Sequence, residues 1–185
     1  MNVSSKQFVK FDLVTLVADT LEETGLSPRC LKLEITESTM VENIDYVATL
    51  MEQLKLTGVK LSIDDFGTGF SSLSILHRFP LDILKIDRSF VAQIKDAEVI
   101  VEVVKTIVTL AQSLNLDIIA EGVETIEQLS QLRHLGCQFG QGYCFAMPLA
   151  AESVGELLGV QPSSSALYYL LPPVNPEIRD SAEYS

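Results

Sequence analysis

The chain has 185 residues, of which 47% are hydrophobic, and this is enough for one domain with a substantial core. Its net charge of −12 argues against binding of a nucleic-acid polymer, which needs a basic surface. No apolar run approaches the roughly 18 residues that span a membrane, and the N-terminus does not have the pattern of a signal peptide.

Helical and strand patterns alternate through the first half of the chain. Apolar residues at helical spacing predict a helix over residues 13–21 and another over residues 44–54. Residues 31–35 alternate between apolar and polar side chains, and residues 59–65 form a strand that ends in two adjacent aspartates. A glycine-containing loop follows this strand, and a short helix begins at Ser71.

The second half continues the same alternation. Its predicted elements are a strand at 83–87, a helix at 97–114, a strand at 117–121, a helix at 126–132, a strand at 138–143 and a short helix at 152–158. Thr125 and Gln128 have the spacing of a capping box at the start of the fourth of these elements. Serine and proline then become frequent, so we expect residues 1–158 to form the domain and residues 159–185 an extended or disordered tail.

The polarity of the two faces of the predicted strands distinguishes between two architectures. Repeated strand–helix units imply parallel strands, either in an open doubly wound sheet or in a (β/α) barrel. Leu33 and Ile35 share one face of their strand, whereas Lys32 and Glu34 share the other. Strands covered by helices on both faces would be apolar throughout, whereas a barrel has helices on one face only. We therefore predict an α/β fold of the TIM-type (β/α) barrel, N-terminally incomplete because a complete barrel takes about 250 residues.

Polar side chains mark the carboxyl ends of the predicted strands. In chain order they are Asn2, Glu34, Asp64 with Asp65, Lys85, Glu121 and Gln141. The carboxyl ends of barrel strands meet at one rim, where four carboxylates would repel one another strongly without a cation. Carboxylate and amide oxygens are hard ligands that suit Mg²⁺ or Mn²⁺. With a lysine that orients a water or neutralises an anionic substrate, the set predicts two-metal hydrolysis of a phosphate ester.

Six motifs follow one another along residues 1–158. They are LEITE at 33–37, DDFGTGFSSL at 64–73, LKID at 84–87, AEGVE at 120–124, QGY at 141–143 and MPL at 147–149. No single motif is specific, but the ordered set resembles the EAL-domain family of cyclic di-GMP phosphodiesterases. The fold of that family is a (β/α) barrel, which agrees with the strand pattern. The resemblance implies a reaction that opens cyclic di-GMP to linear pGpG.

The resemblance also implies a set of metal-binding and catalytic residues. Asn2, Glu34 and Asp64 match metal ligands of the family. Asp65 matches a catalytic residue that reaches the second metal ion, and Glu121 matches a glutamate assigned as general base or metal ligand. The implied cofactor is Mg²⁺ or Mn²⁺ in a two-metal site.

Further residues match positions that support this site in the family. Lys85 matches the lysine that holds the attacking water, and Glu124 and Gln141 match supporting residues. Glu37 matches the residue that anchors the loop over residues 66–72, which is linked to substrate binding and dimerisation in the family. The implied partners are cyclic di-GMP, a second copy of the chain in a homodimer, and regulatory domains upstream.

Simpler roles stay open for several of these residues. Glu37 and Glu124 also fit carboxylates at helix N-termini, which the helix dipole favours. Gln141 fits an amide at a strand edge, and Lys85 fits a plain counter-charge to Asp64. An isolated pair of aspartates is usually an exposed acidic turn.

The chain lacks the Glu-Ala-Leu motif that gives the family its name. In the family this motif supplies a metal-binding glutamate and, just after it, an arginine for the substrate phosphate. Three origins stay open: a start at an internal methionine of a longer protein, a gap filled by another chain, or a truncated gene. The missing glutamate predicts little or no activity for this chain alone.

Two functions compete on these grounds. The first is the catalytic part of a phosphodiesterase, and the second is a non-catalytic module that binds cyclic di-GMP or another protein. A Mg²⁺-dependent barrel enzyme of the enolase type shares the acidic rim, but it should not show the ordered motifs. The three cysteines, without CxxC spacing, indicate reduced, buried thiols, and we expect a cytoplasmic protein unless another part anchors it.

Overall fold

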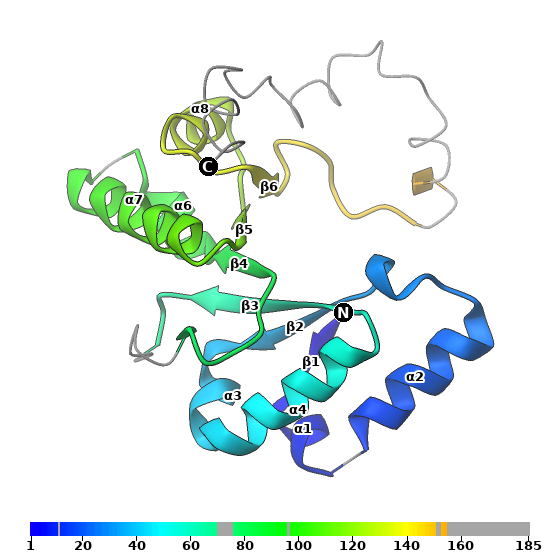
Figure 1. Ribbon diagram of the computed structural model, residues 1–185. Helices are drawn as coiled ribbons and strands as arrows, with labels where there is room; N and C mark the ends of the chain where they lie inside the picture. Colours follow the sequence, from blue (N-terminus) through cyan, green and yellow to red (C-terminus); the bar gives the residue numbers. More distant parts are fainter. Residues whose placement is uncertain (11, 70–75, 96, 151–152, 155–185) are drawn as a thin grey trace, which may run out of the picture.

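The computed structural model of the chain describes residues 1–10, 12–69, 76–95, 97–150 and 153–154 (Figure 1). The helix predicted from Ser71 and the predicted tail lie outside these residues. Of the short helix predicted at residues 152–158, only Ser153 and Val154 are described, and both are helical. No described helix has the length and apolar character to cross a bilayer.

Parallel strands form one sheet whose spatial order follows the chain. The strands are β1 (Asn2–Val3), β2 (Lys32–Thr36), β3 (Lys60–Phe66), β4 (Ile83–Ile86), β5 (Asp117–Glu121) and β6 (Phe139–Gln141). A doubly wound sheet would reverse its strand order at a switch point. The unbroken order instead winds the chain in one direction, as in a barrel, and Figure 1 follows it from dark blue β1 to gold β6. A complete barrel has eight strands, so this six-stranded sheet, with β1 and β6 at its open edges, confirms an incomplete barrel.

Long helices connect the strands as predicted, and several short helices were not predicted. The helices are α1 (Ser5–Lys10), α2 (Leu13–Thr24), η1 (Pro28–Cys30), α3 (Glu37–Glu42), α4 (Ile44–Leu56), α6 (Arg88–Gln93), α7 (Glu98–Ser113) and α8 (Ile126–His134). The short helices α1, α3 and α6 each begin within two residues of a strand's end, and six residues are too few to display a helical period. The capping box of Thr125 and Gln128 is confirmed at the start of α8.

The two faces of the sheet differ as the strand pattern predicts. Leu33 and Ile35 are fully buried in the core that the sheet forms with its covering helices, which includes Met51 of α4 and Val104 of α7. The opposite face carries the polar side chains of the strands, among them the buried Lys85. Helices therefore cover one face, and the other is left for the polar groups.

Strand β3 carries an irregularity that places both of its aspartates on the polar face. The strand was expected to end at Asp64 and Asp65, but it continues to Phe66. Regular pairing with β4 stops at Ile63 and resumes at Phe66, so both aspartates stand opposite Lys85 alone. This is a β-bulge, and Asp65 in it has a φ of 55°, a left-handed conformation that aspartate tolerates better than most residues. Adjacent residues of a regular strand would point to opposite faces.

The three thiols differ in burial. Cys137 is buried, Cys144 is half-buried and Cys30 is exposed, so the expectation of buried thiols is wrong for Cys30. Burial raises the pKa of the Cys137 thiol to about 11.

We expect a thiol reagent to label Cys30 of the native protein at least about 100-fold faster than Cys137 at neutral pH. The thiolate is the reactive form, and Cys137 combines a raised pKa with poor access. Timed labelling followed by mass spectrometry of the peptides measures both rates. In denaturant the two rates should converge, and equal rates in the native protein would contradict the burial of Cys137.

Candidate active site

The register of the sheet aligns the residues expected at the strand ends. Asn2 of β1 lies beside Glu34 of β2, and Glu121 of β5 lies beside Gln141 of β6. Asn2 and Gln141 are exposed at the two outer strands. Lys85 of β4 lies between these pairs, so the residues predicted for one rim come from neighbouring parallel strands.

Lys85 is the cation at the centre of the polar face. Its ammonium donates to Glu34 Oε2 at 2.9 Å, to Asp64 Oδ1 at 3.1 Å and to Glu121 Oε1 at 2.5 Å. An ammonium has three donors, so the three carboxylates use all of them. Burial by itself would lower the pKa of Lys85, but the hydrogen bonds to the three carboxylates raise it above its ordinary value. Lys85 is therefore charged and ties β2, β3 and β5 together.

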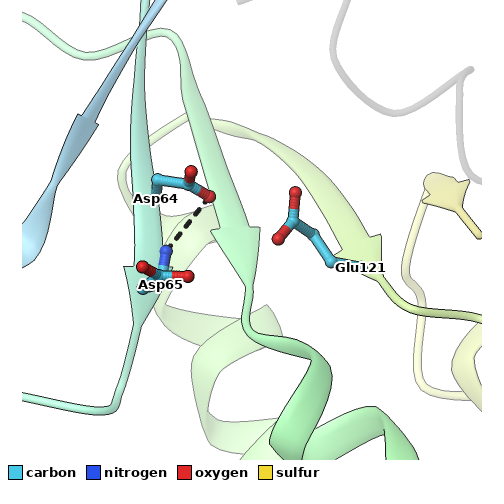
Figure 2. Close-up of side chains that lie close together, drawn as sticks. All are labelled: Asp64, Asp65 and Glu121. Carbon is cyan, nitrogen blue, oxygen red and sulfur yellow. Dashed lines mark hydrogen bonds between the residues drawn. The ribbon is translucent and has the colours of Figure 1, made fainter. Parts of the chain in front are cut away.

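Three carboxylates converge beside this lysine. One oxygen each from Asp64, Asp65 and Glu121 lies within 4.8 Å of the others, and all three residues are partly buried. Figure 2 shows Asp64 and Glu121 pointing toward each other from β3 and β5, across β4. The backbone N–H of Asp65 donates to Asp64 Oδ1 at 3.1 Å. Two oxygens that share one ion lie at most about 4.2 Å apart for Mg²⁺ and about 5 Å apart for Ca²⁺, so separations within 4.8 Å suit an ion of the size of Ca²⁺ directly, and Mg²⁺ would draw any oxygens beyond its limit closer together.

The electrostatics of this cluster also fit a cation. Burial raises the pKa of Asp65, and the neighbouring carboxylates of Asp64 and Asp87 raise it further. Burial also raises the pKa of Glu121, although its hydrogen bond from Lys85 acts in the opposite direction. One lysine thus leaves the carboxylates insufficiently compensated, and a divalent ion would supply the missing positive charge.

Asp87 is a neighbour of the cluster to which the sequence pattern gave no role. It follows β4 and caps α6, where its Oδ1 accepts the backbone N–H of Ser89 at 3.0 Å. Burial would raise the pKa of Asp87, but the hydrogen bonds from Ser89 lower it below its ordinary value. Because Asp87 follows Lys85 by two residues, strand alternation places both on one face, and this spacing could have identified it.

Glu37 lies outside the cluster and binds the loop that follows β3. It is buried as the first residue of α3, and its Oε2 accepts the backbone N–H groups of Gly67 at 3.0 Å and Gly69 at 3.3 Å. A Cβ on Gly69 would lie 2.7 Å from Glu37 Oε1, so a larger residue there would displace the carboxylate from its present position. The carboxylate of Glu37 therefore lies at the N-terminus of α3 and is also hydrogen-bonded to the loop. The rest of the loop, residues 70–72, lies outside the described residues.

Glu124 stands apart from the other predicted site residues. It is exposed, and it precedes Thr125, the N-cap residue of α8. Its backbone N–H donates to Gln128 Oε1 at 2.8 Å. The described structure does not bring Glu124 into the carboxylate cluster, so its supporting role stays a prediction.

We expect Glu37→Gln to accelerate hydrogen exchange of the Gly67 and Gly69 amides about tenfold. A neutral amide oxygen is a weaker acceptor than a carboxylate, and hydrogen bonds to charged groups are about twice as strong as neutral ones. Nuclear magnetic resonance resolves the two amides. The amide of Leu61, which donates to Asp82 Oδ2, is the internal control and should keep its rate. Unchanged rates at both glycines would contradict an anchoring role of Glu37.

Comparisons with known proteins match the sequence of the chain to a family. The model of the EAL domain family matches residues 1–148. "Cyclic di-GMP phosphodiesterase NbdA" of Pseudomonas aeruginosa is 44% identical over 158 residues, which are 85% of this chain and 20% of that protein. The chain spans about a fifth of the length of the first curated relatives it matches.

Solved structures also match the fold. The structure described as "PaMucR Phosphodiesterase, c-di-GMP complex" has a TM-score of 0.80 and 44% identity, over 83% of this chain and 62% of that chain. A Klebsiella pneumoniae BlrP1 "manganese/cy-diGMP complex" has a TM-score of 0.75 and 33% identity, over 80% of this chain and 38% of that chain.

Proposed function

The chain belongs to the EAL domain family, and on this premise we propose that the protein hydrolyses cyclic di-GMP to linear pGpG with two divalent cations. The observation that carries the proposal is the group of Asp64, Asp65 and Glu121 around the buried Lys85. Relatives named as cyclic di-GMP phosphodiesterases, and a similar structure described as a manganese complex, support the substrate and the metal.

The chain's own residues offer a coherent set of ligands. Asp64, Asp65 and Glu121 would hold Mg²⁺ or Mn²⁺, with Glu34 and the neighbouring Asn2 completing the oxygen donors. When bound, the ions supply Lewis-acid polarisation of the phosphate and lower the pKa of water.

Lys85 and Glu121 provide the remaining proposed roles. Lys85 holds the water that attacks the phosphate, and it must first release one of the three carboxylates that occupy its donors. Glu121 serves as the general base or as a metal ligand. Gln141 supports Glu121 from the adjacent strand, and Glu37 supports the loop after β3.

The protein with a complete barrel tests this function directly. We expect cyclic di-GMP hydrolysis that requires Mg²⁺ or Mn²⁺ and stops with a chelator, measured by chromatography of pGpG. The 185-residue chain, which lacks the Glu-Ala-Leu glutamate, should show little or no turnover. Full turnover by this chain would contradict the proposed impairment. Absence of hydrolysis by the complete barrel with either metal would contradict the proposed reaction.

A non-catalytic module is the second candidate, because the chain as given holds one acidic metal ligand fewer than the set that the family resemblance implies. In that case the protein binds cyclic di-GMP or a protein partner, and bound nucleotide is recovered unchanged after incubation with metal. We further propose a cytoplasmic homodimer with regulatory domains elsewhere in the protein. The greater length of the relatives supports those domains.

A further inference from the structure

Arg88 is a cation at the carboxyl end of β4, next to the carboxylate of Asp87, with which it interacts electrostatically. It is the first residue of α6, two positions beyond the last residue of β4, and it is exposed. Across the part of the chain that the structure describes, its guanidinium has no hydrogen-bond or ion-pair partner. Lys85, by contrast, is buried and has all three donors occupied by carboxylates. Arg88 is therefore available to a ligand, whereas Lys85 is not.

Gly122 fixes the position of the Arg88 stem. Gly122 directly follows Glu121 at the end of β5 and has a φ of 66°, which glycine adopts without strain. A Cβ built on Gly122 would lie 2.6 Å from the Cβ of Arg88 and 3.9 Å from its Cγ. The stem of Arg88 thus packs on the backbone immediately after Glu121. This contact places the stem of Arg88 between the ends of β4 and β5, beside the residue that follows Glu121.

The charges at the rim indicate what a cation at the position of Arg88 could bind. Asp64, Asp65 and Glu121 carry negative charge, and the adjacent Asp87 is engaged with Ser89. A cyclic dinucleotide carries two phosphodiester anions, which such a rim repels. Metal ions compensate the carboxylates, and a protein donor in addition to the arginine that follows the Glu-Ala-Leu motif in the family would hold a phosphate of the dinucleotide on this side of the rim. A guanidinium suits this task, because its planar fork binds two phosphate oxygens at once.

We propose that Arg88 binds a phosphate of the cyclic dinucleotide substrate through its guanidinium. The proposal rests on the proposed function of the site and assigns one further residue to it. The contact forms when the substrate binds and persists in the transition state. Its loss should therefore raise KM and leave kcat nearly unchanged.

The test compares Arg88→Gln, Arg88→Lys and Arg29→Gln in the protein that hydrolyses cyclic di-GMP. Arg29 is an exposed arginine in η1, before β2 and so at the opposite ends of the strands, and its substitution makes the same change in charge. We expect Arg88→Gln to raise KM about 10- to 100-fold with kcat within about threefold, as for loss of a charge-assisted pair. Arg88→Lys, which keeps the stem and the charge but not the fork, should be intermediate, and Arg29→Gln unchanged.

The outcomes separate this proposal from the function on which it rests. Equal KM values for Arg88→Gln and Arg29→Gln, with hydrolysis intact, overturn the role of Arg88 alone. Absence of both hydrolysis and cyclic di-GMP binding by the unchanged protein overturns the proposed function and this role with it. If Arg88→Gln does not fold, as judged by its thermal melt, Arg88→Lys decides, and a KM within twofold of the unchanged protein overturns the proposal.

Discussion

Asp65→Asn is expected to lower metal-dependent hydrolysis of cyclic di-GMP about 10³-fold and to raise the melting temperature of the metal-free protein. A bound metal contributes several kcal/mol to such a reaction, and each 1.4 kcal/mol or so is a factor of about ten. Without metal, Asp65 brings a third negative charge to a group whose oxygens lie within 4.8 Å. Asparagine keeps the shape and tolerates the left-handed backbone at this position. The substitution thus removes one metal ligand and, in the metal-free protein, one source of repulsion between carboxylates.

Three measurements on this variant distinguish a metal site from an acidic surface turn. They are the hydrolysis rate, the melting temperature with a chelator, and the rise in melting temperature with Mn²⁺. Asp19→Asn, an exposed change of equal charge on α2, should leave all three unaltered. If Asp65→Asn keeps the Mn²⁺-dependent rise of the unchanged protein, Asp65 is not a ligand. A lower melting temperature in chelator would contradict the repulsion.

Lys85→Met is expected to destabilise the metal-free protein by about 3 kcal/mol. Removing one partner of a buried ion pair leaves an uncompensated charge, with losses of about 3 to 5 kcal/mol. Here the substitution leaves Glu34, Asp64 and Glu121 without their shared cation. Methionine preserves most of the volume, so the loss reports charge rather than a cavity. Urea unfolding in chelator measures it, and hydrolysis should be abolished in the same variant.

Lys55→Met is the matched control for this prediction. Lys55 pairs with Asp82 at 2.7 Å near the start of β3, and both side chains are partly exposed, at 31% and 25%. Its substitution should lower the free energy of unfolding by only about 1 kcal/mol. Mg²⁺ should recover part of the loss in Lys85→Met, because it replaces the missing positive charge, but none in Lys55→Met. Equal losses in the two variants would contradict the central role of Lys85.

The architecture was predictable because strand alternation reports which face of a strand helices cover. The alternation in β2 indicated one apolar face, with Leu33 and Ile35, and one polar face, with Lys32 and Glu34. The burial of these side chains agrees, because Leu33 and Ile35 are buried and the other two are not. The same alternation located Lys85 on the polar face. These features depend on neighbours within one strand, which a sequence displays directly.

Other features depend on contacts between elements, which the sequence does not display. The bulge in β3 arises from its pairing with β4, so two adjacent aspartates gave no sign that both would face Lys85. The three partners of Lys85 come from three different strands. Asp87 has the spacing of a site residue, but its role as the cap of α6 appears only when that short helix is seen. The contact of Gly122 with Arg88 likewise joins two segments far apart in the chain.

The sequential order of the strands also bears on how the sheet can assemble. Among the described strands, each pairs with the strands before and after it, over separations from 20 residues between Glu121 and Gln141 to 34 residues between Lys85 and Ile119. The sheet can therefore grow by adding one strand at a time at its edge. The pairing of β3 with β4 brings Asp64 to Lys85, and the pairing of β4 with β5 brings Glu121. Lys85 is thus the counter-ion that two successive steps of sheet assembly share.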